Sequence, residues 1–152
     1  MIYRKILCPI DFQQDPQPAL TLAAKLARES RGTIYLMHVL PVPTAMLYPS
    51  ETILHADWNW AHKKLQKLAA QLPAGTDREI IIKFGRTVEE IAKVARTVDA
   101  DLIVMGTHGY TGLAHLIHGS VAERVVRTAP CQVLTVPLAK TSEESETTSQ
   151  AA

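Results

Sequence analysis

One short segment of the chain, GTHGYTGLAHLIHGS at positions 106–120, is unusually rich in glycine. The chain has seven glycines in 152 residues, and four of them lie in this segment: Gly106, Gly109, Gly112 and Gly119. Because glycine has no Cβ, it lets backbone N–H groups turn towards an anion and approach it closely. A helical pattern starts at Ser120, and a helix N-terminus favours the same negative charge. The segment therefore predicts a phosphate site.

The spacing of this segment differs from that of two common phosphate-binding loops. The chain contains no G-x-x-x-x-G-K-[ST] sequence and no G-x-G-x-x-G sequence, and no lysine follows Ser120. A helix dipole supplies only about 0.3–1 kcal/mol per charge, so several backbone amides together must hold the phosphate. Ser120 also heads a capping box with Glu123, which gives its hydroxyl a second role. Gly112 is explained by a simple turn.

Strand and helix patterns alternate along the chain. Short apolar and β-branched runs predict strands at 3–10, 33–40, 78–84, 101–105 and 131–137. Helical patterns separate them, at 16–31, at 54–72, from a capping box formed by Thr87 and Glu90, and from Ser120. Strands that alternate with helices require right-handed crossovers and hence a parallel sheet. We expect an α/β fold with a single doubly wound five-stranded parallel sheet, strand order 3-2-1-4-5, and helices on both faces.

Several polar or glycine positions follow the predicted strands directly. Asp11 follows the first strand, His38 and Val39 end the second, and Gly106 follows the fourth. In such a sheet, ligands bind beyond the carboxyl ends of the strands, where the strand order reverses. We therefore expect these positions to converge on one crevice. Asp11 has an alternative role as a turn or cap residue before the helix that follows Pro16.

Composition limits the classes of function. The chain is 47% hydrophobic and 20% charged, as in one ordinary globular domain, which we assign to residues 1–138, with a flexible polar tail at 139–152. A formal net charge of +1 with dispersed Lys and Arg indicates no nucleic-acid partner. The first residues form no signal-peptide core, and no apolar run reaches the length of a membrane helix. We expect a cytoplasmic protein without a membrane partner.

Histidine and cysteine raise the possibility of a metal site. The six histidines include His115 and His118, but no Cys, Asp or Glu joins these two at ligand spacing. We interpret them as surface residues. Cys8 and Cys131 lie far apart in apolar runs and are expected to be buried free thiols. The sequence therefore predicts no metal site built from these side chains.

The long helical pattern carries both tryptophans of the chain. Its apolar face is predicted to pack in the core through Leu54, Trp58, Ala61, Leu65, Leu68 and Leu72. Trp60 lies off this face, near Lys64 and Lys67, and either covers the loop at 41–50 or contacts a partner. The lysines are interpreted as a solvated face.

At the glycine segment the sequence resembles the universal stress protein family, specifically its ATP-binding branch. The resemblance rests on GTHGYTGL and HGSVAERVVRTAPCQVLTVP, with the spacing G-x2-G-x9-G-S, and it extends from the first predicted strand to the fifth. It implies a cytoplasmic homodimer that binds ATP, together with Mg²⁺, and that has no established reaction of its own. By position, the residues that the resemblance assigns to the nucleotide are Pro9, Ile10, Asp11, Val39, Met105, Gly106, His108, Gly109, Gly119, Ser120 and Val121.

The sequence departs from the family pattern at four positions. Tyr110 stands where a basic residue is frequent, His118 where an aliphatic one is usual, and Gln132 where proline is common. Ala122 offers no hydroxyl to a ligand. These departures leave the glycines in place, and they put the affinity for phosphate in question more than the site. His108 is either a ligand contact or an exposed loop residue.

Three classes of function follow from these patterns. The expected one is a nucleotide-binding signalling module, a homodimer paired through the strand at 131–137, which is apolar, uncharged and at a predicted sheet edge. A dedicated hydrolase or nucleotidyl transferase lacks a visible nucleophile–base pair, which leaves at most slow ATP hydrolysis. A dimerisation module of the same fold that binds no nucleotide is the alternative.

Overall fold

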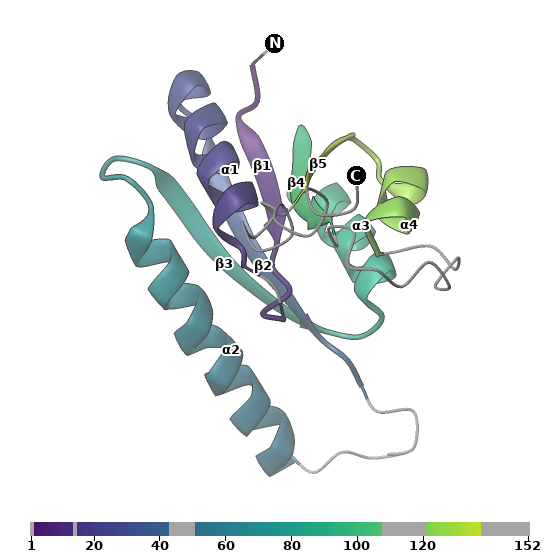
Figure 1. Ribbon diagram of the computed structural model, residues 1–152. Helices are drawn as coiled ribbons and strands as arrows, with labels where there is room; N and C mark the ends of the chain where they lie inside the picture. Colours follow the sequence, from purple (N-terminus) through teal and green to yellow (C-terminus); the bar gives the residue numbers. More distant parts are fainter. Residues whose placement is uncertain (1, 14, 43–50, 108–120, 138–152) are drawn as a thin grey trace, which may run out of the picture.

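Helices and strands alternate along the whole of the described chain (Figure 1). The computed structural model describes residues 2–13, 15–42, 51–107 and 121–137. The elements are β1 (Lys5–Pro9), α1 (Gln17–Ser30), β2 (Thr33–Leu40), α2 (Glu51–Gln71), β3 (Asp77–Phe84), α3 (Thr87–Thr97), β4 (Leu102–Thr107), α4 (Val121–Thr128) and β5 (Gln132–Pro137).

The five strands form one parallel sheet in the order β3-β2-β1-β4-β5, which confirms the expected fold class. β1 is central and pairs with β2 on one side and with β4 on the other. In chain order, β2 and β3 are added on one side of β1. The chain then returns to the other side of β1, where it adds β4 and β5. This reversal of direction between β1 and β4 is the point where such sheets bind ligands.

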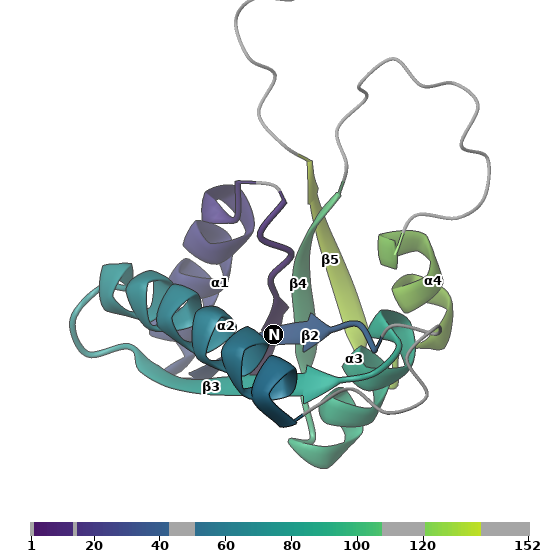
Figure 2. The same cartoon turned by 90° about the horizontal axis from the view of Figure 1, so that it is seen from below.

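Helices cover both faces of the sheet (Figures 1 and 2). Ile6 and Cys8 of β1 belong to one buried cluster, with α1 and the C-terminal half of α2. Leu7 of β1 and Ile103 of β4 belong to the other, with α3 and α4. Successive strand residues point to opposite faces, so a strand covered on both faces has to be apolar throughout. This explains the unbroken apolar sequences of β1 and β4.

The fourth strand is longer than the sequence pattern predicts. It continues past Met105 to Thr107, and Gly106 pairs with Val136 of β5. The prediction that this strand ends at 105 is therefore wrong. The register with β5 is the physical reason, because β5 offers pairing partners as far as Pro137.

The packing of α2 differs from the prediction in its first half. The buried side chains of the helix begin at Ala61, and those of Leu65 and Leu68 pack in the cluster against the sheet. Trp58 is 38% exposed and stacks on His62, with ring centroids 4.6 Å apart, so its assignment to the core is wrong. The apolar period is correct, but only the second half of the helix reaches the sheet. Among the described helices, none is long and apolar enough to cross a membrane.

The predicted capping box of α3 is also wrong. The N-cap residue is Arg86, whose side chain makes no capping hydrogen bond, and Thr87 is the first residue of the helix. The inward face of this helix is as predicted, because Val88, Ile91 and Ala95 are buried. The helix is held by this packing, which commonly outweighs the contribution of a cap.

Candidate functional site

A cavity of about 510 Å³ lies at the carboxyl ends of the central strands. Its walls come from the segment after β1, the end of β2, the end of β4, and the first turns of α3 and α4. Among its described lining residues are Pro9, Ile10, Asp11, Val39, Met105, Gly106 and Val121. Small-molecule sites commonly have volumes of roughly 300–1,000 Å³.

The position of the cavity follows from the topology of the sheet. After β1 the chain enters α1 on one face, whereas α4, which follows β4 in the element order, packs on the other face. Neighbouring strand ends that lead to opposite faces leave a crevice between them. The sequence pattern predicts a crevice at this edge of the sheet, and the structure has one.

Seven of the eleven residues assigned by resemblance line this one cavity, although they come from four separate segments of the chain. The other four lie outside the described residues: His108, Gly109, Gly119 and Ser120. Tyr110, Gly112 and His118 also lie outside the described residues. The structure therefore brings together the β1, β2, β4 and α4 parts of the predicted site.

Hydrogen bonds between the ends of β1 and β2 fix one wall of the cavity. The backbone N–H of Ile10 donates to the carbonyl oxygen of Met37 at 2.7 Å. The carbonyl oxygen of Ile10 lies 2.7 Å from Nδ1 of His38, which is the donor because a carbonyl can only accept. These two bonds hold the backbone before Asp11 against the backbone before Val39.

Asp11 performs the turn role that the sequence left open. Its carboxylate Oδ1 accepts a hydrogen bond of 2.8 Å from the backbone N–H of Gln13, and its backbone carbonyl oxygen also contacts that N–H. A short acidic side chain commonly closes a turn in this way. The side chain is exposed and borders the cavity. The turn therefore places a carboxylate at the mouth of the cavity.

Gly106 differs from the glycines that the fold itself requires. A Cβ built on Gly32 would lie 2.7 Å from the backbone oxygens of Tyr3 and Arg4, so packing excludes a side chain there. Among described atoms, a Cβ on Gly106 would meet nothing closer than the Val136 carbonyl oxygen at 4.0 Å. Packing of the described residues thus does not require glycine at 106, and a side chain there would border the cavity.

The first turn of α4 forms the wall beside Gly106. Val121 and Ala122 line the cavity, and Val125, one turn later, is buried against α3 and the sheet. The N-terminal end of the helix therefore borders the cavity. The leading N–H groups of a helix have no partner within the helix and favour an anion.

Sequence reasoning missed part of the lining. Phe12, Thr87 and Ile91 are not among the predicted site residues, and neither is Trp60. His38 lines the cavity, as its place near the end of the second predicted strand indicates. No nucleotide-binding motif marks Thr87 and Ile91 in the sequence. They line the cavity because α3 packs beside it. Among the described lining residues, the acidic side chains are Asp11 and Asp15, and none is Lys or Arg.

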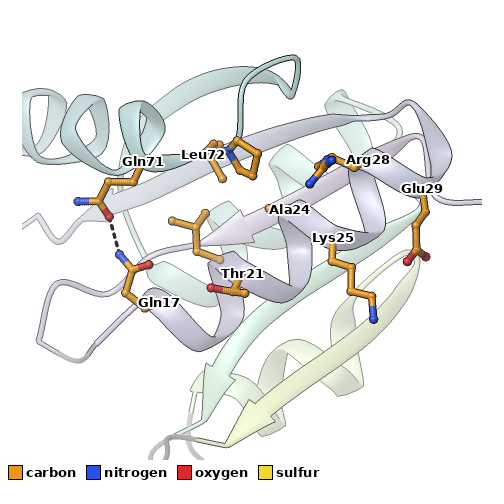
Figure 3. Close-up of a pocket in the computed structure, with 10 residues that line it drawn as sticks. Gln17, Thr21, Ala24, Lys25, Arg28, Glu29, Gln71 and Leu72 are labelled. Carbon is orange, nitrogen blue, oxygen red and sulfur yellow. Dashed lines mark hydrogen bonds between the residues drawn. The ribbon is translucent and has the colours of Figure 1, made fainter.

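A second hollow of about 550 Å³ lies between α1 and the C-terminal end of α2 (Figure 3). At one end Gln17 donates a hydrogen bond of 2.6 Å to Gln71, and Lys25 and Glu29 lie towards the other end. Although it is slightly larger, none of the predicted site residues lines it. The cavity at the strand ends is therefore the candidate site.

Comparison with known sequences identifies the family. The sequence profile of the Universal stress protein family matches residues 2–137. The chain belongs to the universal stress protein family. Universal stress protein MJ0531 of Methanocaldococcus jannaschii is 34% identical over 142 residues, which cover 89% of this chain and 82% of that protein.

Solved structures of other family members share the fold. The universal stress protein UspA from Lactobacillus plantarum is 25% identical, with a TM-score of 0.72, and the match covers 90% of this chain and 99% of that one. A universal stress protein from Archaeoglobus fulgidus, solved in complex with dAMP, is 27% identical, with a TM-score of 0.59 and coverage of 89% and 98%.

The two thiols of this family member are not activated nucleophiles. Burial raises the pKa of Cys8 to about 12, and Cys8 is fully buried as predicted. Cys131 is only half-buried, which corrects its assignment to the core, and its pKa is raised by burial and then by the charge of Asp101. Both are therefore protonated near neutral pH. Within the described ranges, no group of three His, Cys, Asp or Glu side chains is placed to hold a metal ion.

Proposed function

We propose that this universal stress protein binds an adenine nucleotide, ATP with Mg²⁺, in the cavity at the strand ends and acts as a homodimeric signalling module in the cytoplasm. The convergence of seven assigned residues on one cavity carries the proposal. The dAMP complex of the Archaeoglobus fulgidus relative supports an adenine ligand in this family.

The backbone offers a means of holding the phosphates. The first turn of α4 and the glycine at 106 both line the cavity, and the leading N–H groups of a helix favour an anion. The described lining has carboxylates and no Lys or Arg side chain. Phosphate charge would therefore be balanced by backbone amides and by a divalent cation.

The chemistry of the site fits a Mg²⁺ ion that arrives with the nucleotide. Mg²⁺ is usually held by one or two carboxylates and by substrate phosphates, rather than by a complete protein cage. Asp11 and Asp15 both line the cavity and supply carboxylates of this kind. We expect ATP to bind more weakly when EDTA removes the metal.

Calorimetry on purified protein tests the proposal. Nucleotide carried through purification is first identified by mass spectrometry and removed, and ATP, ADP, AMP and GTP are then titrated with Mg²⁺. We expect saturable binding of the adenine nucleotides at one site per chain. If the protein carries no nucleotide and gives no heat with any of the four, the proposal is overturned, and the dimerisation module that binds no nucleotide is favoured.

The carboxylate of Asp11 gives a prediction that separates its two roles. Asp11→Asn keeps an oxygen that can accept the bond from Gln13 but removes the charge, whereas Asp11→Ala removes both. If the carboxylate binds the nucleotide, both variants should lose roughly tenfold or more in ATP affinity, since a hydrogen bond to a charged group contributes about 1.5–3 kcal/mol. Wild-type affinity in the Asn variant, measured by calorimetry, would assign Asp11 to the turn alone.

The homodimer is proposed to form through β5. Among the described strands, β5 pairs with β4 and stands at the edge of the sheet. Leu134 is 37% exposed there, whereas Val133 packs against the buried cluster below. An apolar edge strand needs protection, and pairing with a second copy provides it.

Leu134→Lys should therefore convert the dimer into a monomer. The wild type is expected to have twice the mass of one chain by light scattering at micromolar concentration, and the variant half of that. Lysine at Leu134 costs little in the monomer because the side chain is already exposed, unlike lysine at Val133. Val126→Lys on α4, also exposed, is the control and should remain dimeric. A monomeric wild type would refute the proposal.

A dedicated hydrolase is not supported by the described part of the cavity. Its lining includes His38, whose Nδ1 is bonded to Ile10, and the hydroxyl of Thr87, but no Ser, Cys or Lys. Catalysis of hydrolysis needs a positioned base or nucleophile near the phosphate. We therefore expect phosphate release from ATP to be slow or absent, as a phosphate-release assay would show.

A further inference from the structure

Three aromatic rings from three separate segments of the chain meet at one side of the cavity. Phe12 follows β1, His38 lies in β2 and Trp60 lies in α2. The ring centroid of Phe12 is 4.7 Å from that of His38 and 5.3 Å from that of Trp60. The ring centroids of His38 and Trp60 are 6.0 Å apart. The ammonium group of Lys64 lies 5.3 Å from the centroid of Trp60 and 5.7 Å from that of Phe12.

This aromatic cluster lies on the β2 side of the cavity, away from the end that favours an anion. Gly106 and the first turn of α4 lie on the β4 side, and β1 separates β4 from β2. Adjacent strands are about 4.8 Å apart, so the two sides are separated by roughly 10 Å. A nucleotide with its phosphates at α4 would extend its base across β1 towards His38 and Trp60.

Trp60 is placed at this cavity although the core does not require it there. Its side chain is 46% exposed, and the buried stripe of α2 uses Ala61 and Leu65 instead. Trp58, two residues earlier, does not line the cavity and stacks on His62. The rings of Phe12 and His38 hold Trp60, and the bond from His38 to Ile10 fixes His38 in turn.

We propose that Trp60 is a ligand-binding residue whose ring covers the purine base of the bound nucleotide. The inference rests on the proposed function and names a side chain that contacts the base. An exposed, fixed indole at the base end offers a flat apolar surface at little cost in conformational entropy. Stacking of a base on an aromatic side chain corresponds to roughly a 5- to 150-fold effect on affinity when the side chain is removed.

Calorimetry on four proteins tests this assignment. Trp60→Ala should lose roughly 5- to 150-fold in affinity for ATP, and Trp60→Phe should keep most of it. Trp58→Ala is the matched control, because it removes the same side chain from the same helix away from the cavity, and it should bind as the wild type does. Inorganic tripolyphosphate has no base, so its affinity should be equal in all four.

Fluorescence provides a second readout that does not depend on a loss of binding. The chain has two tryptophans, so Trp58→Phe leaves Trp60 as the single tryptophan, and Trp60→Phe leaves Trp58. ATP should change the emission of the protein that retains Trp60 and not that of the other, and tripolyphosphate should change neither.

The outcomes separate the two proposals. Wild-type ATP affinity in Trp60→Ala, or an equal loss with tripolyphosphate, overturns the role of Trp60 while the nucleotide site stands. If ATP changes the emission only of the protein that retains Trp58, the role of Trp60 is likewise overturned. If the wild type binds no nucleotide, both proposals fail.

Discussion

Replacing Gly106 with valine is expected to abolish nucleotide binding while the sheet remains folded. Gly106 lies in β4 with its partner Val136, and valine is a favourable residue in a strand. A Cβ at this position would have no described atom within 4 Å other than the Val136 oxygen at 4.0 Å. The added side chain would therefore occupy the cavity rather than the core, where it would hold phosphate away from the backbone.

Thermal shift with Mg-ATP measures the effect. At roughly 100 times the dissociation constant, ATP should stabilise the wild type by about 2.7 kcal/mol, or roughly 5–10 °C in a domain of this size. Gly106→Val should show almost none of this shift, and without nucleotide it should melt close to the wild type. A full shift in the variant would exclude Gly106 from the phosphate site.

Gly32→Ala is the contrasting control. Its Cβ would lie 2.7 Å from the backbone oxygens of the two residues just before β1, so this variant should be destabilised by about 1–3 kcal/mol. Because Gly32 is remote from the cavity lining, the variant should still gain stability from ATP. Opposite patterns in the two variants would show that one glycine serves the ligand and the other serves the fold.

Truncating Leu65 to alanine is expected to lower the free energy of unfolding by about 2–5 kcal/mol. Leu65 is fully buried in the cluster that joins α1 and α2 to the sheet. Loss of its side chain removes buried apolar area and leaves a cavity, because close-packed neighbours collapse only in part. Urea denaturation followed by circular dichroism gives the change in free energy.

Lys67→Ala, two residues along α2, provides the control. Lys67 is exposed, so its truncation should change stability by no more than about 0.5 kcal/mol. Equal effects of the two substitutions would contradict the packing of the second half of α2 on the sheet.

Since that packing also positions Trp60, Leu65→Ala should weaken the response of Trp60 fluorescence to ATP.

The sequence alone determined the fold class and the edge of the sheet at which the candidate cavity lies. Alternating strand and helix patterns admit few arrangements, because crossovers between parallel strands are right-handed and both sheet faces have to be covered. The carboxyl ends of parallel strands share one edge, so Asp11, Val39 and Gly106 were bound to converge once the strands were recognised. These conclusions depend on periodicity and connectivity, which a sequence carries directly.

The tertiary structure decided what depends on docking and register. A helical period shows which residues share a face of α2, but not how far along the sheet the helix lies. The position of the helix along the sheet leaves Trp58 outside the core and puts Trp60 at the cavity. The register between β4 and β5 puts Gly106 inside a strand. Thr87 and Ile91 join the cavity through the packing of α3. Such distances between segments arise from the balance of many side-chain contacts, so no local pattern in the sequence records them.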